Sequence, residues 1–354
     1  MTQRSAAPWW RPDRFERKRR FVEARAAIAA ALRAAFSEMA FVEVDTPALQ
    51  VSPGLEPHLA AFETELVGAH PDDRHPLFLH TSPEFAMKKL LVAGLPRIFQ
   101  LAHVFRNGER STTHHPEFTM LEWYRAGAGY HALIDDCRRL LCAAADASGR
   151  HGFAWQGRSA DPRADWQVVT VAASFERHAG IDLLATAPDP AAPDVALLAA
   201  QARPLGIVVH DGDRWEDLFF RIFLDRIEPR LGIGAPTVLT DYPVSMAALS
   251  RPKPDDPRLA ERFELYVCGL ELANAFGELT DPAVQRARFQ ADVALKRRLY
   301  GRAYPVDDDF LAALDHGLPD SAGIALGFDR LVMLATGAAH IEDVLWAPVI
   351  GSLR

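Results

Sequence analysis

Cysteine is scarce in this chain of 354 residues, which contains only Cys137, Cys142 and Cys268. An odd number without a CxxC motif argues against a disulfide framework and favours a reducing compartment. Long apolar runs are also missing, since no stretch approaches ~18 uninterrupted apolar residues and the first residues hold no apolar segment typical of a secretory signal. We therefore expect a cytoplasmic protein without a membrane span.

Positive charge is in deficit as well. Lys and Arg total 39 against 47 Asp and Glu, which gives a net charge of −8. General nucleic-acid binding depends on neutralising many phosphates, so this balance argues against a non-specific DNA- or RNA-binding protein. Hydrophobic residues make up 49% and charged residues 24%, an ordinary globular composition. The length accommodates one large domain or two smaller ones, each with a sizeable core.

Hydrophobic periodicity predicts alternating helices and strands. Helices are expected at residues 14–39, 84–93, 131–145, 215–227, 281–300 and 331–334, and strands at residues 41–44, 77–80, 98–105, 114–122, 263–267 and 271–276. We expect a loose arm at residues 1–13, a polar turn at 70–76 and a surface connection at 181–205. Ser82 suits the cap of the helix at 84–93, and Pro83 suits its first turn. Locally paired strands with helices between them predict an α+β fold, an antiparallel β-sheet flanked by helices.

Two segments combine arginine with residues that suit nucleotide binding. In the first, Arg106 ends a predicted strand, and a polar loop leads to a second strand that carries His114, Phe118 and Tyr124. Such a hairpin can hold a guanidinium over a phosphate and an aromatic ring under a base, because Arg binds phosphate oxygens bidentately. The other segment is residues 323–330 (GIALGFDR), where glycines let the backbone approach a ligand and an Arg follows at a strand-to-helix junction.

A third segment, residues 261–279 (ERFELYVCGLELANAFGEL), spaces Glu264, Glu271 and Glu278 seven residues apart, with Asn274 among them. Carboxylates gathered in one cavity repel each other unless a cation lies between them, and Mg²⁺ bridging nucleotide phosphates is the natural one. Taken singly, each of the three segments is also what an ordinary solvated surface contains. Their combination in one chain is far more specific.

In combination the segments resemble the class II aminoacyl-tRNA synthetases. Residues 33–47 (RAAFSEMAFVEVDTP) resemble motif 1, FRN…HHPEFTMLEWY resembles motif 2, and GIALGFDRLVML resembles motif 3. TSPEF at residues 81–85 and ELANAFGELTDP at residues 271–282 resemble signatures of the lysine subgroup. Within that subgroup the chain is most similar to the lysyl-tRNA synthetase paralogue that acylates elongation factor P. The resemblance runs in order through about residues 14–350 and implies the class II catalytic fold.

The resemblance implies ATP and Mg²⁺ as cofactors, with Arg106 and Arg330 as the catalytic residues. The implied ATP-binding residues are Arg106, Asn107, Gly108, Glu109, His114, His115, Phe118, Glu271, Leu272, Gly327 and Arg330. The implied substrate-binding residues are Ser82, Pro83, Glu84, Tyr124, Asn274, Glu278 and Ala325, and the implied Mg²⁺ ligands are Glu264 and Glu271.

Individual roles follow from the same resemblance. Phe118 would stack on adenine, and Arg330 would cover the other face. Glu84 would meet an amino group near the carboxylate end of the substrate, and Glu278 with Tyr124 would hold the distal ammonium. Two carboxylates for two ammonium groups suit a diamino acid, because a buried unpaired charge is costly.

The chain departs from the family pattern at three positions. The family usually has Glu two residues after the motif 2 Arg, whereas this chain has Gly108 followed by Glu109, so that Glu109 or backbone groups would contact the adenine. The Arg usual just before the motif 2 His is Thr113. Ala325 stands where lysyl-tRNA synthetases usually have Gly, and its methyl group should narrow or reshape the amino-acid pocket, which suits the paralogue better.

We predict an ATP-dependent ligase that activates a lysine-type diamino acid and transfers it to a lysine of elongation factor P. The family preference would be (R)-β-lysine over α-lysine. Motif 1 begins by Arg33, which leaves no room for an N-terminal anticodon-binding OB domain. We therefore expect residues 14–354 to form one catalytic domain, with tRNA an unlikely acceptor. Motif 1 also predicts a homodimer.

An acidic acceptor would need only a local patch of basic residues near the mouth of the active site. Arg106 and Arg110 in the motif 2 loop are candidates, as are Arg251 and Lys253. Three alternatives remain open: a truncated lysyl-tRNA synthetase that acylates tRNA, a non-catalytic regulatory paralogue, and an amide-forming ligase that acts on free small molecules.

Overall fold

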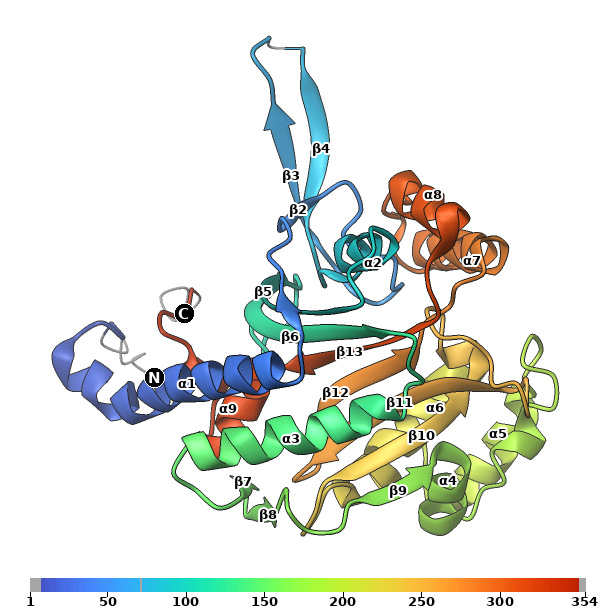
Figure 1. The fold of residues 1–354 in the computed structure, drawn as a ribbon. Coiled ribbons are helices and arrows are strands. Elements are labelled where there is room, and N and C mark those ends of the chain that lie inside the picture. Colours follow the sequence, from blue (N-terminus) through green and yellow to red (C-terminus); the bar gives the residue numbers. More distant parts are fainter. Residues whose placement is uncertain (1–7, 71, 350–354) are drawn as a thin grey trace, which may run out of the picture.

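The computed structural model describes residues 8–70 and 72–349, and an eight-stranded sheet lies at its centre (Figure 1). In sheet order the strands are β1 (Val42–Glu43), β5 (Arg97–Phe105), β6 (Glu117–Ala126), β13 (Ser321–Gly327), β12 (Leu270–Gly277), β11 (Leu259–Val267), β10 (Thr237–Pro243) and β9 (Gln167–Thr170). The two outer pairs are parallel, and all pairs between them are antiparallel. The predicted α+β fold with an antiparallel sheet is confirmed.

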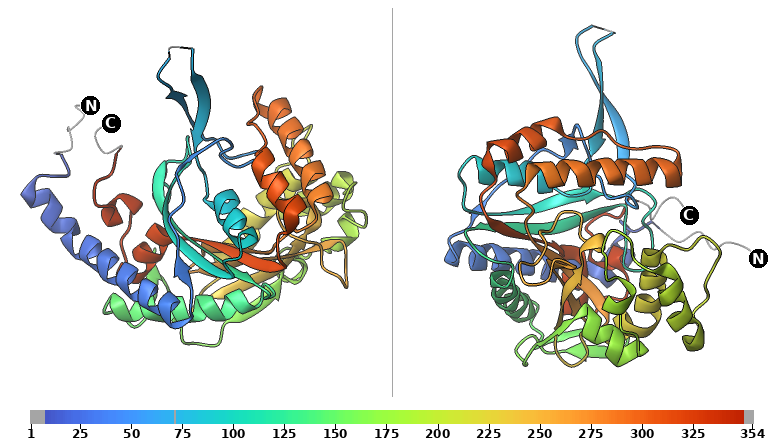
Figure 2. Two further views of the ribbon diagram at one scale, coloured as in Figure 1. Left: turned by 45° about the horizontal axis from the view of Figure 1, so that its top comes forward. Right: turned by 90° about the vertical axis from the view of Figure 1, so that its right-hand side faces the viewer.

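Helices cover both faces of the sheet (Figure 1 and Figure 2). On one face α1 (Pro12–Glu38), α3 (Ala132–Ala147) and α9 (Phe328–Thr336) pack together. On the other face lie α2 (Glu84–Val92), α7 (Pro282–Tyr300) and α8 (Asp308–Gly317). The remaining helices are α4 (Val171–Ala179), α5 (Val195–Ala202), α6 (Trp215–Ile222) and α10 (Ile341–Val344), with short turns η1 (Leu184–Thr186), η2 (Arg203–Leu205), η3 (Phe223–Ile227), η4 (Glu228–Arg230) and η5 (Val244–Met246).

Strand alternation decides which side chains of β6 enter the main core and which stay available for chemistry. Leu121 and Trp123 are buried in the cluster formed with α1, α3 and α9. In that cluster the ring of Phe36 packs edge-on against Trp123, with 5.5 Å between ring centroids. Glu122 and Tyr124 point to the opposite face, because successive side chains of a strand alternate.

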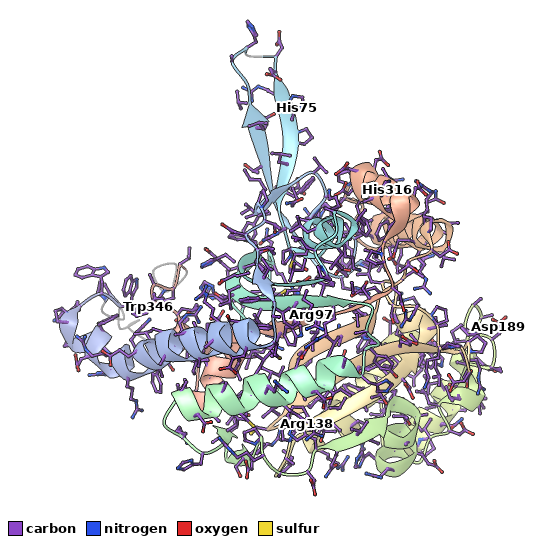
Figure 3. All side chains as sticks on the ribbon, viewed as in Figure 1. His75, Arg97, Arg138, Asp189, His316 and Trp346 are labelled. Atoms are coloured by element: carbon purple, nitrogen blue, oxygen red, sulfur yellow. The ribbon has the colours of Figure 1, made fainter. Side chains whose placement is uncertain are left out.

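A hairpin of β3 (Phe62–Val67) and β4 (Arg74–Leu79) projects from the body (Figure 1) and joins β2 (Leu49–Gln50) in a separate sheet. His75, labelled in Figure 3, lies near its tip. The sequence analysis assigns no strand to residues 62–67, and its turn at 70–76 is too long, because β4 already begins at Arg74. A third small sheet pairs β7 (Phe153–Trp155) with β8 (Arg158–Ala160).

The prediction of a surface connection at residues 181–205 is wrong. Ile181, Leu183 and Leu198 are buried in a second hydrophobic cluster, together with residues of α4 and α6. The Asp194 carboxylate accepts the backbone N–H of Leu197 over 2.9 Å and so caps α5. The apolar positions are sparse among Ala, Pro and Asp, and only packing against α4 and α6 orders them.

Several predicted elements are present with shifted ends. The second strand of the motif 2 hairpin begins at Glu117 and not at His114. Pro116, just before it, has no N–H group to donate to a neighbouring strand, which explains the later start. The N-cap of α2 is Pro83, although the Ser82 hydroxyl does accept the N–H of Glu84 over 3.1 Å. The first helix begins at Pro12, inside the predicted arm. Residues 1–7 of that arm lie outside the described residues.

The cysteines and the possibility of a membrane span can both be examined in the described part of the chain. Cys137, Cys142 and Cys268 are all free thiols. Within residues 8–70 and 72–349, no helix combines the length and apolar composition that crossing a bilayer requires.

Candidate active site

The face of the antiparallel strands that lies away from the main core carries the predicted site. One cross-strand row pairs Glu122 of β6 with Ala325 of β13, then Ala325 with Asn274 of β12. Asn274 in turn pairs with Glu264 of β11. Residues opposite each other in a ladder share a face of the sheet, so this row brings together side chains that lie far apart in the sequence.

A neighbouring row places Tyr124 opposite Gly323, Gly323 opposite Phe276, and Phe276 opposite Arg262. A Cβ atom on Gly323 would overlap the ring of Tyr124 and the carboxylate of Glu278. The glycine therefore makes the room in which these two side chains approach each other.

A cavity of about 620 Å³ opens above these rows. The predicted site residues that line it are Ser82, Glu84, Arg106, Glu109, His114, His115, Phe118, Tyr124, Glu271, Leu272, Asn274, Glu278, Ala325, Gly327 and Arg330. The predicted residues outside the lining are Pro83, Asn107, Gly108 and Glu264. The cavity thus brings together most of the residues that the sequence analysis selected.

One end of the cavity is acidic. The Glu122 carboxylate accepts the hydroxyl of Tyr124 over 2.5 Å and that of Ser82 over 2.7 Å. Glu84 and Glu278 share a single ammonium group, because the Nζ of Lys88 lies 2.5 Å from an oxygen of each. Within this group of four side chains, three carboxylates exceed one ammonium by two charges when all three acids are ionised.

The pKa values of these acids reflect that excess. Burial, together with the charge of Glu84, raises the pKa of Glu122 to about 8, although the two hydroxyl donors favour its charged form. Burial also raises the pKa of Glu278 to about 7, against the lowering effect of Lys88. Both groups are therefore only partly ionised near neutral pH, and a cation entering the pocket would favour their charged forms.

The other end of the cavity is basic. The guanidinium of Arg106 lies over the ring of Phe118, 5.3 Å from its centroid. Its Nη1 is 3.9 Å from a carboxylate oxygen of Glu109. The Nε of Arg106 is buried and has no hydrogen-bond acceptor among the described residues. A buried donor without an acceptor suits an anionic ligand, such as a phosphate or carboxylate oxygen.

Arg330 reaches from α9 across the same end to the motif 2 loop. Its Nη2 lies 2.6 Å from Nε2 of His114, and its Nη1 donates to the backbone oxygen of Glu271 over 2.8 Å. Burial and the nearby Arg330 charge lower the pKa of His114, so the neutral imidazole can accept this hydrogen bond.

The two predicted Mg²⁺ ligands differ in their surroundings. The carboxylate of Glu264 is occupied by donors, which are Arg262 at 2.6 Å and the hydroxyls of Tyr242 and Tyr266, each at 2.5 Å. Within the described residues no group donates a hydrogen bond to the Glu271 carboxylate. Burial and the charge of Glu264 raise the pKa of Glu271 to about 7.

These surroundings suit a magnesium ion that depends on a nucleotide. Across residues 8–70 and 72–349 no group of three or more His, Cys, Asp or Glu side chains could hold a metal by itself. Mg²⁺ is typically bound by one or two carboxylates, with water and phosphate oxygens completing its coordination. Glu271, supported by Glu264, fits that requirement.

Two residues of the site, Glu122 and Lys88, are not among those predicted from the sequence. Each had a usable signal, because Glu122 lies two residues before Tyr124 on one strand, and Lys88 lies four residues after Glu84 on one helix. The departure from the family pattern at Gly108 and Glu109 also has a structural basis. Gly108 has a φ of 86°, a left-handed conformation that favours glycine, and Glu109 lines the cavity in its place.

The proposed acceptor patch at Arg251 and Lys253 is not an open basic surface. Arg251 pairs with Glu261 at 2.6 Å and with Asp320. Lys253 pairs with Asp241 at 3.0 Å. Neither basic residue lines the cavity.

Comparison with known proteins agrees with this geometry. A family profile described as tRNA synthetases class II (D, K and N) matches residues 4–350. The chain belongs to the class II tRNA synthetases.

Within this family, a Vibrio cholerae protein described as elongation factor P–(R)-β-lysine ligase is 40% identical over 329 residues, which cover 92% of this chain and 94% of that protein. A protein with the same description from Vibrio parahaemolyticus is 38% identical over 92% of this chain and 94% of its own length. One from Haemophilus influenzae is 37% identical over 91% of this chain and 92% of its own length.

Proposed function

We propose that this protein is an ATP-dependent ligase that activates a lysine-type diamino acid and transfers it to elongation factor P. One observation carries the proposal: the acidic end of the cavity has an excess of two carboxylates over its single lysine. Two ammonium groups would balance that charge. The relatives described as elongation factor P–(R)-β-lysine ligases support (R)-β-lysine as the substrate.

In the first step the substrate carboxylate attacks the α-phosphorus of ATP, and pyrophosphate leaves. Glu84, Glu122 and Glu278 hold the amino groups, so that the carboxylate of the substrate points toward Arg106. Arg106 and Arg330 stabilise the negative charge that develops on the phosphate oxygens, while Phe118 supports the adenine ring. Positioning and preorganised charge supply most of the rate enhancement in such a site.

In the second step a lysine ε-amine of elongation factor P attacks the activated carbonyl carbon, and AMP leaves. The acceptor amine attacks in its neutral form, and one of its two N–H protons is lost as the amide forms. A translation factor as acceptor places the reaction in the cytoplasm. The net charge of −8 disfavours the extensive phosphate contacts that tRNA would need.

Glu271 would hold Mg²⁺, which when bound would neutralise charge on the ATP phosphates. Glu264 would support Glu271 and not ligate the ion, because its carboxylate is bonded to other side chains and lies outside the cavity lining. Arg262, Tyr242 and Tyr266 keep the Glu264 carboxylate in a fixed orientation through the hydrogen bonds described above. The Arg262 side chain also donates to the Asn274 side chain over 3.1 Å. This hydrogen bond links Glu264, which Arg262 also contacts, to a residue proposed to bind substrate.

We also propose a homodimer formed through motif 1. β1 lies at an edge of the main sheet, and Val42 on it is 51% exposed. Leu49 and Val51, just after motif 1, are 49% and 51% exposed. Exposed apolar side chains beside an open sheet edge suit a partner subunit. Sedimentation at micromolar concentration should give a dimer, and a monomer would contradict this part of the proposal.

The decisive experiment compares acceptors in parallel. ATP–pyrophosphate exchange is first measured with (R)-β-lysine and with α-lysine. Transfer of the radiolabelled amino acid to elongation factor P and to lysine tRNA is then followed with the same enzyme. We expect fast transfer to the protein and little to tRNA. Efficient charging of tRNA with none to the protein would establish the synthetase alternative, and no exchange with any diamino acid would establish a non-catalytic paralogue.

A further inference from the structure

Lys88 is buried at the acidic end of the cavity, in contact with two residues proposed to bind substrate. Its side chain is 1% exposed and projects from α2. The Nζ lies 2.5 Å from Oε1 of Glu84, one turn earlier on the same helix, and 2.5 Å from Oε2 of Glu278. A single buried ammonium therefore connects the carboxylates that would receive the two amino groups of the substrate.

The electrostatics keep this lysine charged. Burial alone would lower the pKa of Lys88, but the two carboxylates outweigh burial and raise it above its ordinary value. The same attraction lowers the pKa of Glu278 relative to burial alone. Because opposite charges attract, Lys88 favours the ionised form of Glu278.

Other charged or titratable groups surround the pair on separate elements. Glu122 and Tyr124 face it from β6, Arg251 attracts Glu278 from the loop before β11, and Glu56 lies near Glu84 from the loop after β2. Among the described residues, the group that ion-pairs with both Glu84 and Glu278 is Lys88.

We propose that Lys88 is a positioning residue for the diamino acid, an inference that rests on the proposed function. Its ammonium orients Glu84 and Glu278, so that with Glu122 they present their carboxylates to a substrate with two ammonium groups. Without Lys88 the pocket would hold three carboxylates that repel each other. Glu278 would then take up a proton more readily near neutral pH, and the pocket would lose charge that recognises the substrate.

The test compares Lys88→Met with Lys89→Met. Lys89 is the matched control, because it is the next residue of the same helix and pairs with Asp307 at 3.1 Å and Asp309 at 2.9 Å, outside the cavity lining. ATP–pyrophosphate exchange is measured from pH 6 to pH 9 with (R)-β-lysine or α-lysine. For Lys88→Met we expect the amino-acid KM to rise roughly 10-fold or more at pH 7, and its pH profile to move up by about one unit. The KM for ATP should change little, and Lys89→Met should match the wild type.

A folded Lys88→Met enzyme with an unshifted pH profile would overturn the inference, as would an equal shift in Lys89→Met. If Lys88→Met does not fold, the double variant Lys88→Met/Glu278→Gln replaces it, because removing both partners leaves neither charge buried alone. Compared with Glu278→Gln, the double variant should show a further upward shift of the pH profile, because the charge of Lys88 also lowers the pKa of Glu122. Identical profiles would again refute the role of Lys88. Failure of the wild type to show any diamino-acid-dependent exchange would instead refute the proposed function, which keeps the two failures distinct.

Discussion

Glu122 accepts the hydroxyl hydrogen of Tyr124, its neighbour two positions along β6, over 2.5 Å. Both side chains are buried on the face of the sheet that lines the cavity. The hydroxyl favours the ionised form of Glu122 and opposes the effect of burial on its pKa. This pair therefore controls how readily the pocket offers negative charge to a cationic substrate.

Tyr124→Phe should weaken amino-acid binding while leaving ATP binding nearly unchanged. A hydrogen bond to a charged group contributes about 1.5–3 kcal/mol, so we expect the amino-acid KM to rise roughly 10- to 150-fold. Tyr130→Phe is the control, since Tyr130 donates to Asp241 over 3.1 Å and lies outside the cavity lining. ATP–pyrophosphate exchange kinetics are measured for both variants. Equal amino-acid KM values for Tyr124→Phe and wild type would show that Tyr124 does not contribute to amino-acid binding.

The amino-acid KM should fall as the pH rises through about 7 and about 8, the raised pKa values of Glu278 and Glu122. The sign follows because only the ionised carboxylates attract ammonium groups. Glu122→Gln should remove the part of this dependence near pH 8. A KM that is flat from pH 6 to pH 9 in the wild type would contradict the prediction.

The same pKa shifts carry a stability prediction of opposite sign for the ligand-free protein. An acid whose pKa is raised by folding stabilises the fold fully below its unfolded pKa, near 4.3 for Glu, and loses this contribution as the pH rises through the folded value. Glu122 should therefore destabilise the empty protein above about pH 8. In thermal unfolding, the Tm of Glu122→Gln should rise relative to that of the wild type as the pH increases from 6 to 9. A constant difference would count against a buried, titrating Glu122.

Gly323→Ala should abolish most amino-acid activation without unfolding the chain. The added methyl group would collide with the ring of Tyr124 and the carboxylate of Glu278, and both must shift to admit it. We expect kcat/KM for the amino acid to fall about 100-fold, since misplacing binding groups by about 1 Å has that order of effect. Gly129→Ala is the control, because nothing lies within 4 Å of the position that its new Cβ atom would take. Wild-type kinetics for Gly323→Ala would mean that the pocket lies elsewhere.

Arg25→Met should destabilise the fold far more than Arg33→Met on the same helix. The Arg25 guanidinium pairs with Asp329, whose side chain is 1% exposed, and also donates to the hydroxyl of Thr119 over 2.8 Å. Leaving Asp329 buried without its partner should cost about 3–5 kcal/mol of unfolding free energy. Arg33 pairs with Glu43 at an exposed site, where the expected loss is at most about 1 kcal/mol. Urea unfolding of the two variants gives the comparison, and similar midpoints would show that the buried pair contributes little.

Local sequence patterns were enough for the elements that carry the motifs. Asp281 caps α7 through the N–H groups of Ala283 and Val284, as an Asp-Pro helix start suggests. Residues 98–105 and 271–276 form strands, as alternation and apolar content indicate. The segment around Ile181 and Leu198 was misjudged, because its few apolar residues acquire meaning only from the helices that bury them.

The sequence by itself determined the order of the motifs and the chemical kinds of residue, such as arginine for phosphate and carboxylate for ammonium or Mg²⁺. The tertiary structure alone decided which charges share one pocket. Ladder register sets Glu122 and Ala325 opposite each other although they lie far apart in the chain, and helix α2 brings Lys88 to within 2.5 Å of Glu278. Electrostatic energies depend on distance and burial, and neither quantity can be read from spacing along the chain. The balance of three carboxylates against one lysine therefore arises only when the strands and α2 are packed together.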